Sequence, residues 1–340
     1  MMRAQAARPL VSVVIKALDE AENIGRAIES ALVASAGLAA EIIVADALSS
    51  DGTAEIAARY PVRVVQLLDA ADRSCGCGGQ LGFQYSSGAF VLLMDGDMVV
   101  EPAFLRAALR EMDRDASIGA IGGTYREESA ALEFALRRER RGSNIFAIGH
   151  VGQITGLGLY RGAALAELGY FTDRNLHCNE EWELGQRLAT KGWRCTRLDA
   201  PSFRHYGDTL PPAQLLRQRW RSRYVWGSGE LVKRAFGTGY FRAALARQWK
   251  YLAMIGWWIA LVVTAAVSPL AAPVLLLAAP AAAVLWKRAP SAGLYSFALW
   301  NLYAAGFVRG VLRPLADPHA PIAARIYADG EIEPRRAVNQ

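Results

Sequence analysis

Cysteine and histidine are scarce in this sequence, which has four of each among its 340 residues. The cysteines, at positions 75, 77, 178 and 195, lack the paired spacing of a structural zinc site. A metal-binding or redox pair at Cys75 and Cys77 is the alternative, but in a cytoplasmic protein we expect all four to remain thiols. The composition therefore argues against a zinc module and against a disulfide scaffold.

A nucleoside-triphosphate loop is also missing. The glycine-rich residues 74–82 contain no lysine, so they lack the pattern with which such loops hold phosphates. Glycine lets a backbone approach a ligand closely, but a plain flexible turn explains the same composition. The segment therefore predicts either a backbone that lies close to a ligand or a plain flexible turn.

Charge is absent from residues 251–286. The stretch contains apolar runs at residues 252–268 and 270–286, each near the roughly 17–25 residues that cross a bilayer. We predict a hairpin of two membrane-spanning helices, with a single kinked or re-entrant element as the alternative. A third apolar run, residues 294–308, is interrupted by Asn301. For this run we favour an interfacial helix over a span or a helix packed on the hairpin.

Basic residues flank these runs and set the expected orientation. Residues 1–9 lack the apolar core of about 7–15 residues that marks a secretory signal peptide. We therefore expect the inner (cytoplasmic) membrane, with the N-terminal domain facing the cytoplasm. The formal net charge is +6, and its concentration at this boundary indicates anionic membrane lipids as the partner and no nucleic acid. The flanking residues are Arg234, Arg242, Arg247, Lys250, Lys287, Arg288, Arg309 and Arg313.

Short β-branched runs alternate with helical periodicity through the N-terminal part. Helices lie between the runs, and in the first of them Ile24, Ile28 and Leu32 share a face while Asp19 provides the cap. This alternation predicts an α/β fold with a mainly parallel sheet. An amphipathic surface helix is predicted at residues 127–141. The predicted strands are residues 11–15, 41–44, 62–65, 90–94, 119–124 and a run around 193–198.

Two carboxylates, Asp95 and Asp97, follow the apolar run at residues 90–94. Open α/β sheets bind their ligands at the carboxyl ends of parallel strands. Carboxylate oxygens suit Mg2+ or Mn2+, which commonly bridge protein carboxylates to substrate phosphates. An Asp-Gly turn that caps the next helix is the alternative for an isolated Asp-x-Asp sequence. The context therefore has to decide between a metal site and a turn.

Acidic turns also follow the first two predicted strands, at residues 16–20 and 46–53. Together with Asp95-Gly96-Asp97, these segments resemble the nucleotide-sugar half of the family 2 glycosyltransferases, which have the GT-A fold. The resemblance covers residues 9–206. It implies an enzyme that transfers a sugar from a nucleotide-diphosphate donor and uses Mg2+ or Mn2+.

The resemblance also implies roles for single residues. Asp46 contacts the nucleotide base, Asp95 faces the ribose or diphosphate, and Asp97 binds the metal. Ala47 and Leu48 stand where the family usually has a second acid and a glycine, so the base contacts differ here. Asp19 is either a pocket residue or a helix cap, and the segment after Arg73 passes beneath the nucleotide. The donor-site residues are Ala17, Asp19, Glu20, Asp46, Arg73, Gln80 and Asp95.

A second acidic group, Glu180 and Glu181, opens a predicted helix. The helix dipole by itself favours negative charge in a first turn, so this group has a purely structural interpretation. An inverting glycosyl transfer, however, needs a carboxylate that takes the proton of the acceptor hydroxyl. The resemblance places this catalytic base at Glu181, where the family usually has aspartate, with Glu180 as the alternative.

His205 follows the last predicted strand of the domain. A lone histidine is more often a surface or packing residue than a ligand. In the resembling enzymes a histidine near this point completes the metal shell or contacts the diphosphate. His205 is therefore a second candidate metal ligand.

Arg219 and Trp220 match the end of the Gln-x-x-Arg-Trp motif of the same family, which contacts the acceptor glycan and diphosphate in processive synthases. Leu216 stands at the first position of the motif, and this argues against processive synthesis. Leu216, Trp220 and Tyr224 also share one helical face among arginines, which is typical of a helix at a membrane surface. Both interpretations place this helix beside the acceptor.

We therefore expect a membrane-anchored, metal-dependent inverting glycosyltransferase that acts on a lipid-linked or envelope-glycan acceptor. A noncatalytic membrane module that binds sugar nucleotides and a metal-dependent nucleotidyltransferase are the alternatives. The expected regions are a GT-A domain at residues 1–210, an interfacial helical segment at 211–250, a transmembrane hairpin with a third apolar helix at 251–313, and a cytoplasmic tail at 314–340.

Overall fold

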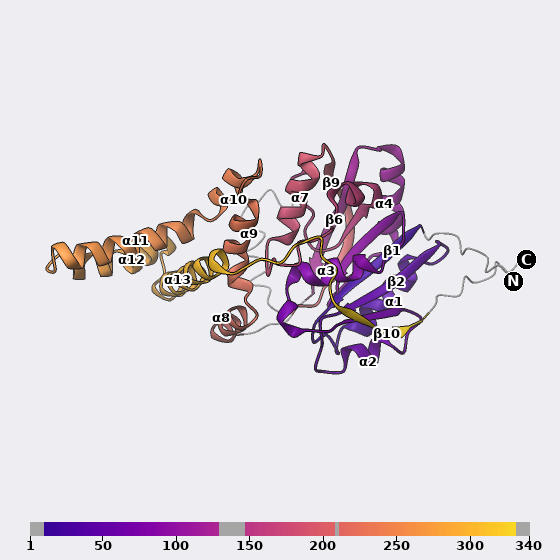
Figure 1. Cartoon of the computed structure of the whole chain (residues 1–340), viewed down its shortest axis with the longest axis horizontal. Helices are drawn as coiled ribbons and strands as arrows, with labels where there is room; N and C mark the ends of the chain where they lie inside the picture. Colours follow the sequence, from indigo (N-terminus) through magenta and orange to yellow (C-terminus); the bar gives the residue numbers. More distant parts are fainter. Residues whose placement is uncertain (1–9, 129–146, 208–210, 331–340) are drawn as a thin grey trace, which may run out of the picture. The chain divides into compact units, whose positions relative to one another are not determined.

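The computed structural model describes residues 10–128, 147–207 and 211–330 (Figure 1). Backbone contacts divide the chain into two units. The first comprises Met1–Asn175, Glu180–Thr209 and Ala316–Gln340, and the second comprises Leu176–Asn179 and Leu210–Leu315. Each unit is thus assembled from segments that are distant in the sequence. The predicted surface helix at residues 127–141 lies almost entirely outside the described residues.

The first unit is built on a mixed sheet of ten described strands. The strand order is β10-β3-β2-β1-β4-β8-β6-β9-β5, and β7 pairs with β9. The strands are β1 Val11–Ala17, β2 Ala40–Asp46, β3 Arg63–Leu67, β4 Phe90–Asp95, β5 Met98–Val100, β6 Ile118–Glu127, β7 Gly149–Val151, β8 Gly158–Arg161, β9 Arg194–His205 and β10 Ala324–Asp329.

The predicted α/β class is confirmed. Strands β3, β2, β1 and β4 are parallel neighbours, and all four coincide with predicted strands. The other half of the sheet mixes directions, because β8 is antiparallel to β4 and β6 whereas β9 is parallel to β6. In the parallel half, the carboxyl ends of β3, β2, β1 and β4 lie along the same edge of the sheet.

Helices cover both faces of this sheet. Alternate side chains of β1 enter different cores, since Val11, Val13 and Ile15 pack with the helices α1, α2 and α4, whereas Val14 belongs to the core on the opposite face. That opposite face is covered by α3, α6 and α7. The helices are α1 Ile24–Ala34, α2 Thr53–Ala57, α3 Cys75–Gln84, α4 Pro102–Arg114, α6 Gly162–Leu168 and α7 Glu180–Thr190, with the 3-10 helix η1 at Ala70–Asp72.

The glycine-rich segment forms α3, so the alternative of a plain flexible turn there is wrong. Ser74 caps this helix, because its Oγ accepts a hydrogen bond of 2.9 Å from the backbone N–H of Cys77. A Cβ atom at Gly82 would lie 2.2 Å from Cγ1 of Val14, and one at Gly79 would lie 2.6 Å from Oγ1 of Thr172. The glycines therefore serve close packing of the helix. Burial raises the pKa of Cys77 to about 12, which keeps it a thiol.

The first helix begins later than predicted. Its N-cap is Asn23, and α1 starts at Ile24, so the expectation that Asp19 caps this helix is wrong. Asp19 instead adopts a left-handed backbone conformation with φ of 56°. Its Oδ1 accepts a hydrogen bond of 2.7 Å from the backbone N–H of Ser50, which joins the turns that follow β1 and β2.

Residues after the last helix return to the first unit. Strand β10, yellow in Figure 1, pairs antiparallel with the edge strand β3. The side chain of Gln84 on α3 both donates to and accepts from the backbone of Ile322. Residues 316–330 are thus an integral part of the first unit, where β10 extends the sheet, whereas the sequence predicted a tail.

The second unit is helical. Its elements are α8 Pro212–Arg221, η3 Tyr224–Trp226, α9 Gly227–Ala235, α10 Phe241–Arg247, α11 Trp249–Val267, α12 Ala272–Lys287 and α13 Pro290–Leu312. Helix α11 is long and apolar enough to cross a membrane, whereas α12 is apolar but has only 16 residues. The two predicted apolar runs therefore form two consecutive helices, which lie side by side in Figure 1.

The third apolar run forms α13, which packs against α11, α12 and α9. Asn301, the polar interruption, is satisfied within the helices, because its Oδ1 accepts from Trp258 Nε1 at 2.6 Å and its Nδ2 donates to the Phe297 carbonyl at 2.8 Å. Near the other end of α13 the backbones of α9 and α13 touch. A Cβ atom at Gly229 would lie 2.0 Å from the carbonyl oxygen of Phe307.

Candidate functional site

The carboxyl ends of β1, β2 and β4 lie side by side at one edge of the sheet. In the register of these parallel strands, Ala17 pairs with Asp46 and Lys16 pairs with Asp95. Parallel pairing alone brings together three segments that are separated by about thirty to fifty residues. The structure thus assembles the predicted donor-side residues of these strands at one place.

Lys16 lies between two acidic groups at this edge. Its Nζ is 2.8 Å from Oδ1 of Asp95 and 3.9 Å from Oε1 of Glu180. Burial lowers the pKa of Lys16, but the Asp95 and Glu180 carboxylates outweigh this and hold it well above its usual range. The sequence analysis gave Lys16 no role. A lysine at the end of an otherwise apolar strand was the available signal.

Asp97 and His205 are brought together by strand pairing. Strand β5 runs antiparallel to β9 with Met98 opposite His205, and Oδ2 of Asp97 lies 3.0 Å from Nε2 of His205. The other oxygen of Asp97, Oδ1, is buried and has no hydrogen-bond partner among the described residues. A buried carboxylate oxygen without a partner is costly unless a ligand or ion satisfies it.

These two residues fit a divalent ion only in part. Among the described residues, no group of three His, Cys, Asp or Glu side chains is arranged to hold a metal ion. Mg2+ and Mn2+ sites at phosphate substrates, however, usually take only one or two protein carboxylates and complete their shell with phosphate oxygens and water. The free oxygen of Asp97 fits such a site, with His205 beside it. The metal remains a prediction.

Glu181 lies in the first turn of α7, beside Glu180. Its Oε1 accepts a hydrogen bond of 2.6 Å from the backbone N–H of Gly156. Although part of its surface reaches solvent, surrounding atoms remove most of its hydration, and the Glu180 carboxylate adds repulsion. These effects raise the pKa of Glu181 to about 8, while the charge of Lys16 opposes them. A carboxyl with such a pKa is a stronger base than an ordinary glutamate.

Asp46 is completely buried at the end of β2. Its Oδ2 accepts hydrogen bonds from Gln66 Nε2 at 2.8 Å and from the backbone N–H of Ser49 at 3.2 Å. Oε1 of Gln66 in turn accepts from Nε of Arg325 on β10 at 3.1 Å. Arg325 of the last strand therefore helps to orient the Asp46 carboxylate through Gln66. The predicted contact of Asp46 with a base stays a prediction.

Three further predicted donor-site residues make contacts within the protein. Arg73 donates from Nε to the Ala47 carbonyl at 2.7 Å and from Nη2 to the Leu48 carbonyl, so it braces the turn after β2. Oε1 of Gln80 accepts from the backbone N–H of Phe171 at 2.8 Å. The backbone N–H of Glu20 donates to Thr53 Oγ1 at 2.8 Å. Their predicted ligand contacts stay predictions.

Arg197 on β9 is a buried residue that the sequence analysis missed. Its Nη1 donates to the Gly123 carbonyl at 2.9 Å, whereas Nε and Nη2 have no hydrogen-bond partner in the part of the chain that the structure describes. Burial lowers the pKa of Arg197, and the Glu181 carboxylate opposes this effect. A positive charge thus lies in the field of the candidate base. The alternating pattern of a strand does not show that Arg197 is buried, because exposed polar side chains are common in strands.

Arg219 and Trp220 belong to α8 in the second unit. Nη1 of Arg219 donates a hydrogen bond of 3.1 Å to the Tyr303 hydroxyl, and its guanidinium lies 5.4 Å from the ring centroid of Tyr224. The ring of Trp220 lies 5.3 Å from the guanidinium of Arg309. Both predicted acceptor residues therefore contact aromatic or basic side chains next to the apolar helices.

Comparison with known proteins agrees with this geometry. Residues 12–169 match the family model for glycosyl transferase family 2. A curated relative, the succinoglycan biosynthesis protein ExoO of Rhizobium meliloti (strain 1021), is 37% identical over 107 residues, which is 31% of this chain. The match spans 30% of the length of that relative.

A solved structure has a similar fold. The mannosyltransferase PcManGT from Pyrobaculum calidifontis, in complex with GDP-Man and Mn2+, superposes with a TM-score of 0.57 at 19% identity. That match covers 90% of this chain and 88% of the other. TarS of S. aureus with UDP-GlcNAc matches 63% of this chain and 66% of its own, with a TM-score of 0.46 and 17% identity. The predicted GT-A-like fold is confirmed.

Proposed function

We propose that this protein is a membrane-anchored, metal-dependent inverting glycosyltransferase. It transfers a sugar from a nucleotide-diphosphate donor to a lipid-linked or envelope-glycan acceptor. The observation that carries the proposal is the grouping of Lys16, Asp95, Glu180 and Glu181 at the sheet edge of a family 2 domain. Because this edge combines a half-buried cation with a carboxylate of raised pKa, it suits both a leaving diphosphate and an attacking hydroxyl.

Glu181 is the proposed catalytic base. It accepts the proton of the acceptor hydroxyl, whose oxygen forms a bond to the anomeric carbon as the bond to the diphosphate breaks on the opposite side. The backbone N–H of Gly156 orients the carboxylate through one oxygen, so the other is available to take the proton. Glu180, which lies closer to Lys16, has a positioning role.

Lys16, Asp95 and Asp97 form the proposed diphosphate end of the site. Lys16 provides a half-buried positive charge held by Asp95, and this charge favours a departing anion. A bound Mg2+ or Mn2+ would act as a Lewis acid on the diphosphate, and Asp97 with His205 would hold it. Asp46 ends β2, which lies on the other side of β1 from β4 and Asp95. At this position it would face the base of the donor.

Membrane anchoring is supported by the exposed apolar surface of α11. Val262 and Val267 of this helix are 68% and 80% exposed. Apolar surface of this extent is unfavourable in water, so a bilayer or a partner must cover it. The relative named for succinoglycan biosynthesis supports a polysaccharide-building role at the cell envelope. The proposed location is the inner membrane, with the first unit in the cytoplasm.

A donor screen tests the proposed reaction. Membranes that contain the full chain are supplied with nucleotide-diphosphate sugars, and release of the nucleotide diphosphate is followed with and without Mn2+ or Mg2+. We expect one donor to support metal-dependent release, and Asp97→Asn to abolish most of it because a charged ligand is lost at nearly constant shape. Binding of donors without any release would favour the noncatalytic module. Release of pyrophosphate from a triphosphate would favour a nucleotidyltransferase.

Alkaline extraction tests the anchor. We expect full-length protein to stay in the membrane pellet after carbonate treatment, because helices that span a bilayer resist high pH whereas peripheral proteins dissociate. A peripheral membrane protein of the same cells serves as the control for complete extraction. Full-length protein in the supernatant would exclude the spanning hairpin and leave a surface attachment through basic helices.

A further inference from the structure

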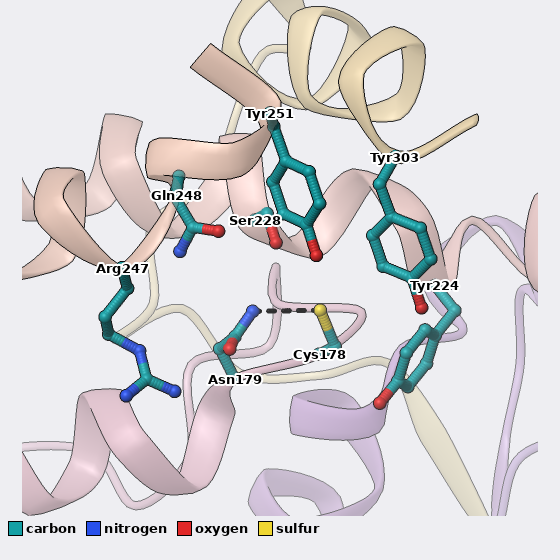
Figure 2. A pocket seen from close by; sticks show the side chains of 8 residues that line it. All are labelled: Cys178, Asn179, Tyr224, Ser228, Arg247, Gln248, Tyr251 and Tyr303. Atoms are coloured by element: carbon teal, nitrogen blue, oxygen red, sulfur yellow. Dashed lines mark hydrogen bonds between the residues drawn. The ribbon is translucent and has the colours of Figure 1, made fainter. Parts of the chain in front are cut away.

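The second unit contains a polar cavity of about 250 Å3. Its wall is built from the segment before α7, from η3 and α9, from the junction of α10 with α11, and from α13. Figure 2 shows the ends of the Cys178, Asn179, Ser228 and Tyr251 side chains facing a common space, with the guanidinium of Arg247 at its edge. The lining residues are Cys178, Asn179, Tyr224, Ser228, Arg247, Gln248, Tyr251 and Tyr303.

The wall favours an anion. Every lining side chain carries a nitrogen, oxygen or sulfur atom, and none of the eight is Asp or Glu. The one formal charge in the wall belongs to Arg247, and a guanidinium can bind a single oxyanion through several N–H groups. Ser228, Gln248 and Tyr303 are buried and add hydroxyl and amide donors. Such a set matches phosphate oxygens better than it matches a cation or an apolar group.

A second guanidinium strengthens this bias. Arg219 donates to the hydroxyl oxygen of Tyr303 at 3.1 Å, so the hydroxyl hydrogen of Tyr303 is left to donate elsewhere. The same guanidinium lies 5.4 Å from the ring centroid of Tyr224. Tyr303 and Tyr224, two of the tyrosines in the wall, therefore both lie next to the positive charge of Arg219.

The place of the cavity indicates where the anion comes from. Gln248 is the N-cap of α11 and Tyr251 lies in its first turn, so the cavity opens at the polar end of the apolar helix. A ligand whose charged head occupies the cavity has the exposed apolar surface of the same helix beside it. The volume is also below the range of about 300–1,000 Å3 typical of whole small-molecule ligands, which suits a headgroup.

We propose that this cavity binds the phosphate group of a membrane lipid, with Arg247 as the main contact. The inference deepens the proposed function, on which it rests only for the identity of the natural ligand, since a lipid-linked acceptor carries such a phosphate. The binding itself requires neither a sugar donor nor a metal. The structure thus gives Arg219 a new role, because it supports the phosphate site through Tyr303.

Binding is tested on detergent-purified full-length protein by native mass spectrometry. The probe is dioleoyl phosphatidic acid, and dioleoylglycerol is the matched lipid without phosphate. We expect phosphatidic acid to bind at least about tenfold more tightly than dioleoylglycerol. Arg247→Gln should reduce phosphatidic acid binding by about tenfold, since hydrogen bonds to a charged group are lost. Tyr303→Phe, which removes one hydroxyl, should cause a smaller loss.

The control is Arg110→Gln, which removes an equal charge from an exposed position of α4 in the first unit and should leave binding within about twofold of the wild type. Arg247→Lys keeps the charge and should give an intermediate affinity, which separates loss of contact from misfolding. Equal binding by Arg247→Gln and wild type, or an equal loss in Arg110→Gln, would overturn the proposal.

Free phosphate is the other source of the same chemistry. Inorganic phosphate is therefore added as a competitor, and we expect millimolar concentrations to displace phosphatidic acid only weakly. Displacement at equal concentrations would show a soluble-anion site and overturn the assignment to lipid. Since no sugar donor is present, failure of this assay leaves the donor screen unaffected, and failure of the donor screen leaves this assay unaffected.

Discussion

At the scale of single residues, the assignment of Glu181 as the base makes the sharpest prediction. Glu181→Gln keeps the size and hydrogen-bonding capacity of the side chain but removes its basicity. Transfer should fall by about 10²–10⁴-fold while donor affinity persists. Donor binding is measured by calorimetry beside the transfer rate, and Glu180→Gln should have a smaller effect. If Glu180→Gln were inactive and Glu181→Gln normal, the two roles would have to be exchanged.

The raised pKa of Glu181 gives this prediction a pH signature. Because a base acts only when deprotonated, the transfer rate should rise with pH through the pKa near 8. The positive charge of Lys16 lowers that pKa, so Lys16→Met should move the rising limb to higher pH, whereas Lys16→Arg should leave it nearly in place. If the transfer rate rose at the same pH in the wild type, Lys16→Met and Lys16→Arg, a group other than Glu181 would be responsible for the pH dependence.

At the scale of elements, glycines decide how closely helices approach. Gly229 on α9 faces the backbone of α13, and a Cβ atom there would lie 2.0 Å from the Phe307 carbonyl oxygen. Gly229→Ala forces the two helices apart, and this strain of about 1–3 kcal/mol exceeds the gain of about 1 kcal/mol in helix propensity. We therefore expect a lower melting temperature in detergent.

A matched glycine in α11 is the control for this effect. Gly256 has no atom within 4 Å of the position its Cβ would take, so Gly256→Ala should leave the melting temperature unchanged or slightly raised. Equal effects of the two substitutions would show that the contact between α9 and α13 is not limiting for stability. The same logic explains the glycines of α3, where composition suggested a turn and packing produced a helix.

At the scale of the whole molecule, the chain leaves the first unit, forms the second and returns as β10. A chain that ends at Leu315 loses β10 and exposes the edge of β3. It also loses the hydrogen bond from Arg325 to Gln66, which orients Asp46. We expect a lower melting temperature and weaker donor binding than in a chain that ends at Gly330.

Arg325→Ala separates the two parts of this effect. It keeps the strand but removes its contact with Gln66, so it should weaken donor binding more than it lowers the melting temperature. The measurements are thermal unfolding and donor titration on the same preparations. Unchanged stability and affinity in the chain that ends at Leu315 would show that β10 contributes nothing to the site.

The sequence by itself determined the elements whose signals are local. Alternating β-branched residues defined β1 to β4, and the absence of charge defined α11 and α12. The order of strands and helices also predicted that Asp46 and Asp95 meet at one edge, because the carboxyl ends of parallel strands coincide. Motif spacing then connected this edge to a family of enzymes.

Only the tertiary structure decided which distant residues touch. The ion pair of Lys16 with Asp95, the contact of Asp97 with His205 and the support of Asp46 by Arg325 each join segments that are far apart in the chain. The cavity around Arg247 likewise draws its wall from four separate segments. The local pattern of polar and apolar residues does not predict such contacts. They depend on strand register and on packing between elements that are far apart in the sequence.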